Sequence, residues 1–277
     1  MAVRLSSDAD TLPANPYGQI QFARNPGFCY PTQHLSSVTS LGRIQFATNN
    51  GQRSLGWDST QQTNKGVGMI YEVRTYNLQP GSVPVYEENF AKALPSREKH
   101  SKLGAFWHTE FGTLNQVIHV WPYESLDERD SIRAEAEKEP EWLNFRVVTD
   151  PNTYISMESE IYTPAPFMRP LGGDQELGSV YEMRVYTYQP GSMPEVINRW
   201  ASAIPHREEY SPLAAAMSSE IGDLNKWIHI WPYKDLNDRS KVRAEAIQNP
   251  NWPPPTREFL VKQENKLMVP SSFSPMH

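Results

Sequence analysis

The chain has 277 residues, more than one average domain holds, so its length predicts two compact units plus an extension. A hydrophobic fraction of 38%, an aromatic fraction of 11% and interspersed charges with a net value of −6 are typical of a soluble globular protein. The sequence has no membrane-length apolar run and no basic stripe, which argues against a membrane protein and against a nucleic-acid partner.

Residues 1–68 form an N-terminal arm rich in Gln, Asn, Ser, Pro and Gly. Segments 18–25 and 42–49 each contain Ile-Gln-Phe-Ala, which could add a short strand to a sheet edge; a disordered tail is the alternative. The first ten residues lack a secretory pattern, and the lone Cys29 excludes an intramolecular disulfide. We therefore expect the cytoplasm, while a mitochondrial address stays open.

The rest of the chain is a tandem repeat. Tyr71 to Pro84 reads Tyr-Glu-Val-Arg-Thr-Tyr-Asn-Leu-Gln-Pro-Gly-Ser-Val-Pro and returns as Tyr181 to Pro194, an offset of 110 (181 − 71). No gap is needed as far as Trp142 and Trp252, after which the second copy has a shorter loop. Each copy is too long for a solenoid unit, so we predict two complete domains, residues 69–170 and 178–277.

The first half of each copy predicts a strand, a helix and a hairpin. Residues 69–76 alternate and are rich in β-formers, and Gly81, Ser82 and Pro84 then announce a helix that runs toward residue 100. Pro95 and its counterpart Pro205 predict a kink or a break in that helix. Segments 105–111 and 114–121 follow as two short strands around a glycine.

The second half predicts a helix and a closing strand. Ser125 to Glu128 is a capping box, and Pro140 or Pro250 stops the helix. Segments 153–162 and 262–269 are the last strands. The order βαββαβ predicts an α+β, ferredoxin-like domain with both helices on one face of a four-stranded antiparallel sheet. We expect the two uncovered faces to pair as an α/β barrel around a polar-lined cavity.

These motifs resemble the NIPSNAP family. The resemblance rests on Tyr-Glu-x-Arg-x-Tyr followed by Gln-Pro-Gly-Ser, on Leu-Asn with Ile-His-x-Trp-x-Tyr, and on the closing Pro-x-x-Phe, and it covers residues 69–275 twice over. It implies the dimeric α/β-barrel superfamily, whose relatives include cofactor-free monooxygenases and haem-degrading and haem-dependent enzymes. It implies no settled reaction, because NIPSNAP proteins have none.

Strand periodicity places Glu72, Arg74 and Tyr76 on one face and Tyr71 and Val73 on the other. We predict that the apolar face lies under the helices and that the mixed face lines the barrel cavity. Six residues are predicted to be catalytic, namely Glu72, Arg74, His108, His119, Arg184 and His229. Eight are predicted to bind the substrate, namely Tyr76, Phe106, Glu110, Asn115, Trp121, Tyr186, Asn225 and Trp231.

A carboxylate, a guanidinium and an imidazole in a partly apolar cavity can anchor an anionic or enolisable ligand and move a proton. His119 or His229 would be the base, and Arg74 or Arg184 would clamp the anion. The alternative interpretation is a structural ion-pair network, Glu72 with Arg74 or Arg74 with Glu110. In the second copy Phe106, Trp107 and His108 become Ala216, Met217 and Ser218, so a single active cavity is expected in the first half.

No metal or cofactor is predicted. The seven histidines lack a His-x-x-x-His pair, and there is no nucleophile elbow and no phosphate loop. The sequence favours a small, apolar or aromatic metabolite as ligand, handled by a cofactor-independent acid/base enzyme or monooxygenase. The alternative is a non-catalytic assembly module that uses the arm. A homo-oligomer is expected.

Overall fold

A computed structural model defines residues 68–277, except for the side chains of residues 146–148. Residues 1–67 of the predicted arm, with both Ile-Gln-Phe-Ala pieces and Cys29, lie outside the described residues. In the described part of the chain, no helix is long and apolar enough to cross a membrane.

Each repeat folds in the predicted order. The first contains β1 (Ile70–Leu78), α1 (Val83–Arg97), β2 (Ala105–Phe111), β3 (Gln116–Tyr123), α2 (Leu126–Ala136), α3 (Pro140–Val148) and β4 (Tyr154–Pro164). The second contains β5 (Val180–Tyr188), α4 (Met193–Glu208), β6 (Ala215–Ile221), β7 (Lys226–Tyr233), α5 (Leu236–Ala246) and β8 (Leu260–Pro270). Short 3₁₀ turns, Pro151–Thr153 and Arg257–Phe259, precede β4 and β8.

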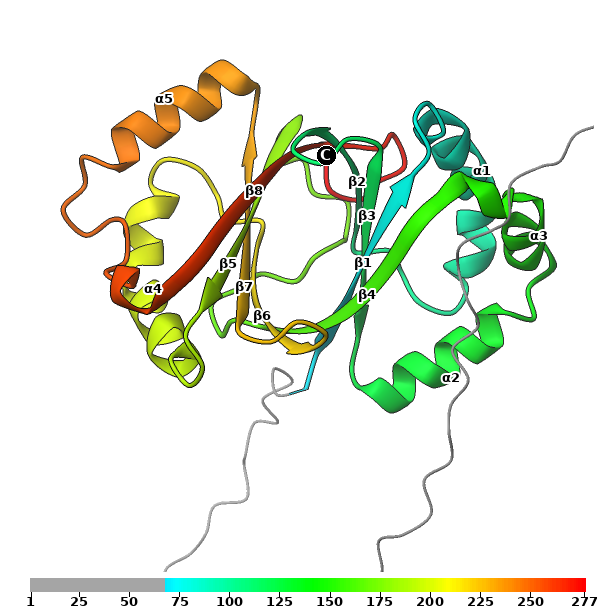
Figure 1. Ribbon diagram of the computed structural model, residues 1–277, viewed down its shortest axis with the longest axis horizontal. Helices are drawn as coiled ribbons and strands as arrows, with labels where there is room; N and C mark the ends of the chain where they lie inside the picture. Colours follow the sequence, from blue (N-terminus) through cyan, green and yellow to red (C-terminus); the bar gives the residue numbers. More distant parts are fainter. Residues whose placement is uncertain (1–67) are drawn as a thin grey trace, which may run out of the picture. The chain divides into compact units, whose positions relative to one another are not determined.

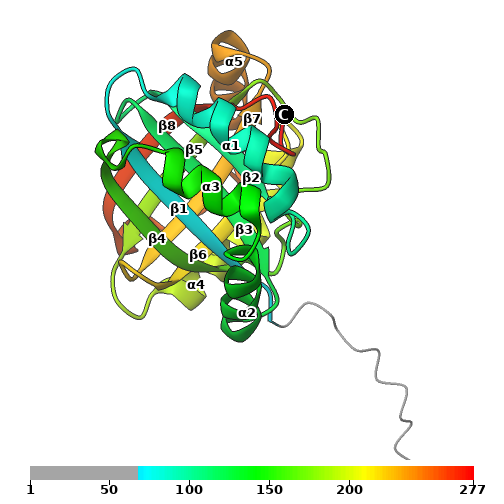
Figure 2. The ribbon, with the colours of Figure 1, turned by 90° about the vertical axis from the view of Figure 1, so that its right-hand side faces the viewer.

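All eight strands belong to one antiparallel sheet. Their order is β1-β3-β2-β8-β5-β7-β6-β4, and β4 pairs with β1, so the sheet closes as a barrel. The repeats meet twice, where β2 pairs with β8 and where β4 pairs with β6. Helices α1 to α3 cover the outside of the first repeat's strands, and α4 and α5 cover the second's (Figures 1 and 2).

The helix boundaries follow from local sequence. The Ser125 side chain accepts the Glu128 N–H at 3.1 Å and caps α2, while Asp235 caps α5 by accepting the N–H groups of Asn237 and Asp238. The predicted break at the helix prolines is wrong. Pro95 lies in the last turn of α1 and Pro205 in the last turn of α4, so each removes one hydrogen bond where the helix is about to end.

Helix α3 was not expected from the sequence, and it is confined to the first repeat. Pro140, predicted only to stop α2, is the first residue of α3, where its missing N–H costs nothing. The second repeat has three consecutive prolines, residues 253–255, in the corresponding segment and stays non-helical there. Helix α3 carries Trp142 and Phe145, which pack into the outer core of the first repeat. The two repeats therefore differ in the elements that pack against the outer face of the sheet.

The predicted assignment of the two sheet faces is wrong. Tyr71, Val73, Ile118 and Val120 pack inside the barrel against Tyr181 and Met183 of the other repeat. The face with Glu72, Arg74, Tyr76, His119 and Trp121 lies outside, under α1 and α2. Bulky side chains such as Trp107, Tyr162 and Met268 occupy the interior expected to hold a polar-lined cavity. Both faces carry large apolar residues, so alternation alone could not decide between them.

Charged side chains cross from one repeat to the other near one end of the barrel. Lys226 of β7 lies 2.9 Å from Glu160 of β4, and Glu160 also accepts the Tyr162 hydroxyl at 2.8 Å. The equivalent contact of the other junction is different, because Lys266 of β8 donates to the Gln116 side chain at 2.5 Å. The two junctions therefore share a backbone pattern and differ in charge.

The repeats also exchange the segments that follow their last strands. Ser271 donates its N–H to the Phe106 carbonyl, and Phe273 stacks on Phe90 at 5.6 Å in the core of the first repeat. In return, the Ala165 N–H bonds the Ala216 carbonyl, and Phe167 packs on Trp227 of the second repeat. Each outer core is thus completed by the other half of the chain.

This exchange predicts that Phe273→Ala destabilises the first repeat by about 1–3 kcal/mol, because the ring is partly buried between Phe90 and Phe106. Phe111→Ala is the matched control, since Phe111 is 55% exposed and should change stability by about 0.5 kcal/mol or less. Urea unfolding measures both. Equal midpoints for the two variants would show that the exchanged segment adds nothing to the core.

Candidate functional site

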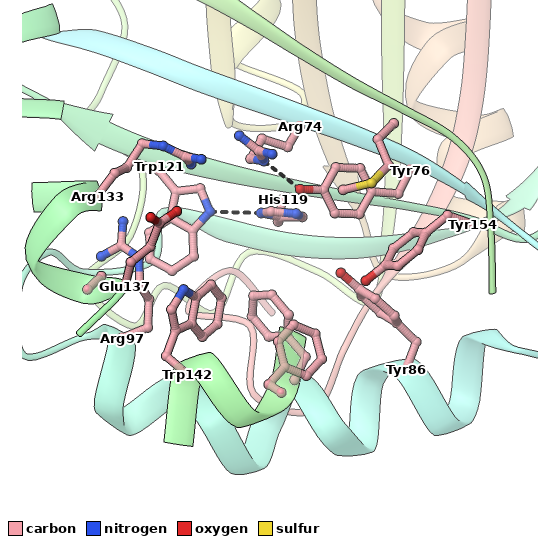
Figure 3. A pocket seen from close by; sticks show the side chains of 14 residues that line it. Arg74, Tyr76, Tyr86, Arg97, His119, Trp121, Arg133, Glu137, Trp142 and Tyr154 are labelled. Atoms are coloured by element: carbon pink, nitrogen blue, oxygen red, sulfur yellow. Dashed lines mark hydrogen bonds between the residues drawn. The ribbon is translucent and has the colours of Figure 1, made fainter. Parts of the chain in front are cut away.

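Each repeat has a pocket between the outer face of its strands and its helices. The first, a cavity of about 260 Å³, lies between β1, β3, β4 and helices α1, α2 and α3. Its strand side presents Arg74, Tyr76, His119 and Trp121, and its helix side presents residues such as Arg97 (Figure 3). The polar face that the sequence assigned to the barrel interior therefore does line a pocket, but on the outside of the barrel.

His119 is held at the back of this pocket by aromatic rings. It is 3% exposed, stacks on Phe106 at 5.6 Å and meets Tyr76 edge-on at 5.0 Å. The Trp121 indole N–H donates to its Nδ1 at 2.7 Å. An indole can only donate, so Nδ1 is unprotonated and the proton of the neutral ring sits on Nε2.

The His119 Nε2 is buried and has no hydrogen-bond partner. Burial lowers the pKa of His119 well below its usual range, and the charge of Arg74 lowers it further, so the ring is neutral at pH 7. The imidazole therefore offers an N–H to a ligand oxygen. That geometry supports a hydrogen-bond donor and not the general base predicted from the sequence.

Glu72 is the centre of a buried ion-pair network. Its carboxylate is fully buried and lies 2.6 Å from Arg74, 2.8 Å from Arg129 and 3.6 Å from Arg133. Burial raises the pKa of Glu72, but the hydrogen bonds from Arg129 and Ser159 and the charges of the arginines outweigh it and bring the pKa to about 2. The Glu72–Arg74 ion pair that the alternative interpretation expected is thus present, while Arg74 forms no pair with Glu110.

The guanidinium of Arg74 already has protein partners, since it donates to the Tyr76 hydroxyl at 2.6 Å in addition to its ion pair with Glu72. Arg97 of α1 is a different case. It is 3% exposed, donates to Tyr123 at 3.0 Å and to Ser101 at 2.9 Å, and lies 4.3 Å above the Trp121 ring. It has no carboxylate partner among residues 68–277, whereas Arg74 is paired with Glu72.

Besides the buried Glu72, four predicted first-repeat residues do not line the pocket, namely Phe106, His108, Glu110 and Asn115. His108 is bound to Glu87 of α1 at 2.8 Å and lies 3.5 Å from Glu110, which is largely exposed. Asn115 adopts a φ of 55° at the end of the β2–β3 turn, where its side chain accepts the Gly81 N–H at 3.4 Å. Phe106 packs behind His119.

The second pocket is built in the same way and is larger, about 390 Å³. Predicted residues Arg184, Tyr186, His229 and Trp231 all line it, whereas Asn225 lies at the turn with a φ of 60°. Trp231 donates to His229 Nδ1 at 2.7 Å, and His229 Nε2 is again buried without a partner. Burial lowers the pKa of His229 well below its usual range, as do the charges of nearby arginines.

The sequence reasoning missed the helix side of both pockets. Arg97, Arg133 and Trp142 recur at the same offset as Arg207, Arg243 and Trp252. The signal in the sequence was an arginine that recurs at the same position of a helix in both repeats. It did not point to the site because the helices were expected to cover the opposite face of the sheet. Tyr86, Phe90, Phe145 and Tyr154 complete the aromatic wall of the first pocket.

The fold and the paired pockets define a two-repeat ferredoxin-like protein with one small-molecule-sized cavity per repeat. The NIPSNAP family model matches residues 71–169 and 181–275. Human Protein NipSnap homolog 3A is 30% identical over 219 residues, spanning 76% of this chain and 86% of that protein. Protein NipSnap of Drosophila melanogaster is 30% identical over 216 residues, spanning 75% and 78%. The chain belongs to the NIPSNAP family.

A solved structure shows that the fold is shared more widely. A putative monooxygenase from Fusobacterium nucleatum matches with a TM-score of 0.54 at 11% identity, over 73% of this chain and 92% of that one. At this identity the likeness concerns the fold alone.

The two buried histidines predict a loss of stability in mild acid. Both are neutral when folded, but the unfolded chain takes up protons below a pKa of 6.5, so the free energy of unfolding should fall from pH 7 to pH 5. The slope reaches at most about 1.4 kcal/mol per pH unit for each histidine. Urea titrations at pH 7, 6 and 5 measure it, and His119→Phe should reduce the slope.

Glu72 and His108 also have shifted pKa values, but they do not cause a loss of stability between pH 7 and pH 5. Burial raises the pKa of Glu72, but the arginines and Ser159 outweigh it and bring the pKa to about 2, so its contribution is complete above pH 4.5 and is lost only as the pH falls toward 2. The hydrogen bond to Glu87 raises the pKa of His108, so its contribution is complete below pH 6.5 and is lost only at higher pH. An unchanged slope in His119→Phe would mean that His119 is charged in the folded protein.

Proposed function

We propose that the chain binds a small, uncharged aromatic metabolite carrying a carbonyl or hydroxyl oxygen in the pocket of the first repeat. The observation that carries the proposal is the buried, unpartnered Nε2–H of His119. A buried donor without an acceptor costs about 1–3 kcal/mol, and a ligand oxygen would remove that cost. Phe90, Trp142 and Tyr154 supply flat apolar surface for the rest of the ligand.

The same groups suit a cofactor-independent reaction that passes through an enolate or phenolate. A neutral N–H donor fixed among aromatic rings stabilises charge that develops on a substrate oxygen, and Arg97, which lines the same pocket, adds to this. Among the described residues that line the first pocket, Glu137 is the carboxylate, and we assign to it the proton-accepting role that the sequence predicted for His119. An acid/base enzyme or a monooxygenase would both use this arrangement.

The assembly role remains the alternative, but it depends on residues 1–67 and no observation on the described residues favours it.

The proposal predicts that 2-naphthol binds the protein and that His119→Phe weakens this binding about tenfold, because one buried hydrogen bond is worth about 1–1.5 kcal/mol. Isothermal titration calorimetry measures the affinity. His229→Phe is the matched control, since it removes the equivalent imidazole and leaves the first pocket intact. Equal weakening by the two variants, or no binding to the wild type, would refute the proposal.

A further inference from the structure

The two pockets differ in their charge, although they share one architecture. Four arginines line the second pocket, namely Arg184, Arg207, Arg243 and Arg257, and none of its lining residues is Asp or Glu. Among the side chains that the structure describes, the first pocket is lined by three arginines and one carboxylate, Glu137. At the 110-residue offset, the position of Glu137 is taken by Ile247, which lines the second pocket and is 59% exposed. The second pocket therefore lacks a carboxylate at the position where the first pocket has Glu137.

The buried carboxylate beneath the second pocket cannot balance its cations. Glu182 is fully buried and already lies 3.0 Å from Arg184, 2.7 Å from Arg239 and 3.2 Å from Arg243. One negative charge therefore serves three guanidinium groups. The local excess of positive charge exists before Arg207 is counted.

Arg207 is a buried cation without a counterion among the described residues. It is 3% exposed, and its guanidinium donates to Ser211 at 2.9 Å and to Tyr233 at 3.2 Å. It lies 4.2 Å above the Trp231 ring and has no carboxylate partner within residues 68–277. A buried, unpaired charge is costly, and an arginine cannot escape that cost by losing its proton. An anion in the pocket would relieve it.

The remaining walls fit a flat ring. Trp200, Trp231 and Trp252 surround the second pocket, with Trp200 and Trp252 meeting edge-on at 5.5 Å. His229 adds a buried, unpartnered N–H. Trp200 stands where the first repeat has Phe90, so a larger aromatic ring lines the second pocket at this position.

We propose that the pocket of the second repeat binds an organic anion with a planar aromatic body, its acid group on Arg207 and its ring against Trp200 and Trp252. The two halves of the chain then handle different ligands, an acid in the second and an uncharged molecule in the first. This inference rests on the proposed function only in placing a ligand between sheet and helices.

The test compares 2-naphthoate with 2-naphthamide, which has nearly the same shape and no charge, by calorimetry on the full chain. We expect 2-naphthoate to bind at least tenfold more tightly than the amide. Ile247→Glu should abolish this preference by restoring the carboxylate of the first pocket, whereas Ile247→Gln should keep it. Both changes are at an exposed position, so the fold is not at risk. Arg207→Met should also abolish the preference, and Arg97→Met should not.

Each contrary result has a separate meaning. Equal affinities for acid and amide would overturn the anion inference and leave the proposed function of the first pocket untouched. A preference for the acid that survives Ile247→Glu would place the anion elsewhere and also overturn the inference. No binding of either probe would remove the second pocket as a ligand site, while 2-naphthol and His119→Phe test the first independently.

Discussion

The structure depends on the fact that neither repeat can complete its own sheet. A four-stranded unit leaves β2 and β4 as free edges, and each edge finds a strand only in the other repeat. The same pairing buries the apolar faces that carry Tyr71 and Tyr181 against each other. The helices are consequently restricted to the outside, and any pocket between a sheet and its helices must open there. The position of both sites follows from this closure.

Order and topology were readable from the sequence, but the direction of each face was not. The repeat, the turn at Gly112 and the cap at Ser125 each have a local cause that acts within a few residues. Which face of a strand lies under the helices is decided by residues that are distant in the sequence. Glu72 and Arg74 can be buried under helices only because Arg129 and Arg133 of α2 reach the carboxylate, and no property of the β1 segment reveals that contact.

The site was predicted in part for the same reason. Strand residues such as Arg74, His119 and Trp121 share a face, so the period of two grouped them correctly although it misplaced the group. Arg97 and Arg207 come from helices, and no carboxylate among residues 68–277 is paired with either of them. A missing partner of this kind cannot be recognised in the sequence, because it depends on which side chains the fold brings together. The role of His119 likewise depends on which ring nitrogen accepts the Trp121 N–H, a matter of side-chain orientation.

The unequal charges at the two junctions between the repeats favour pairing of the first repeat with the second over pairing of two identical repeats. Glu160 faces Lys226 at one junction, while Lys266 faces Gln116 at the other. Two copies of the first repeat would lose the Glu160 to Lys226 ion pair, and two copies of the second would set lysine against lysine. Mixed pairing is favoured, and a covalent tether supplies that mixed partner at a fixed effective concentration. Because the two repeats are covalently linked, each keeps its pairing partner even when the residues that line the two pockets differ.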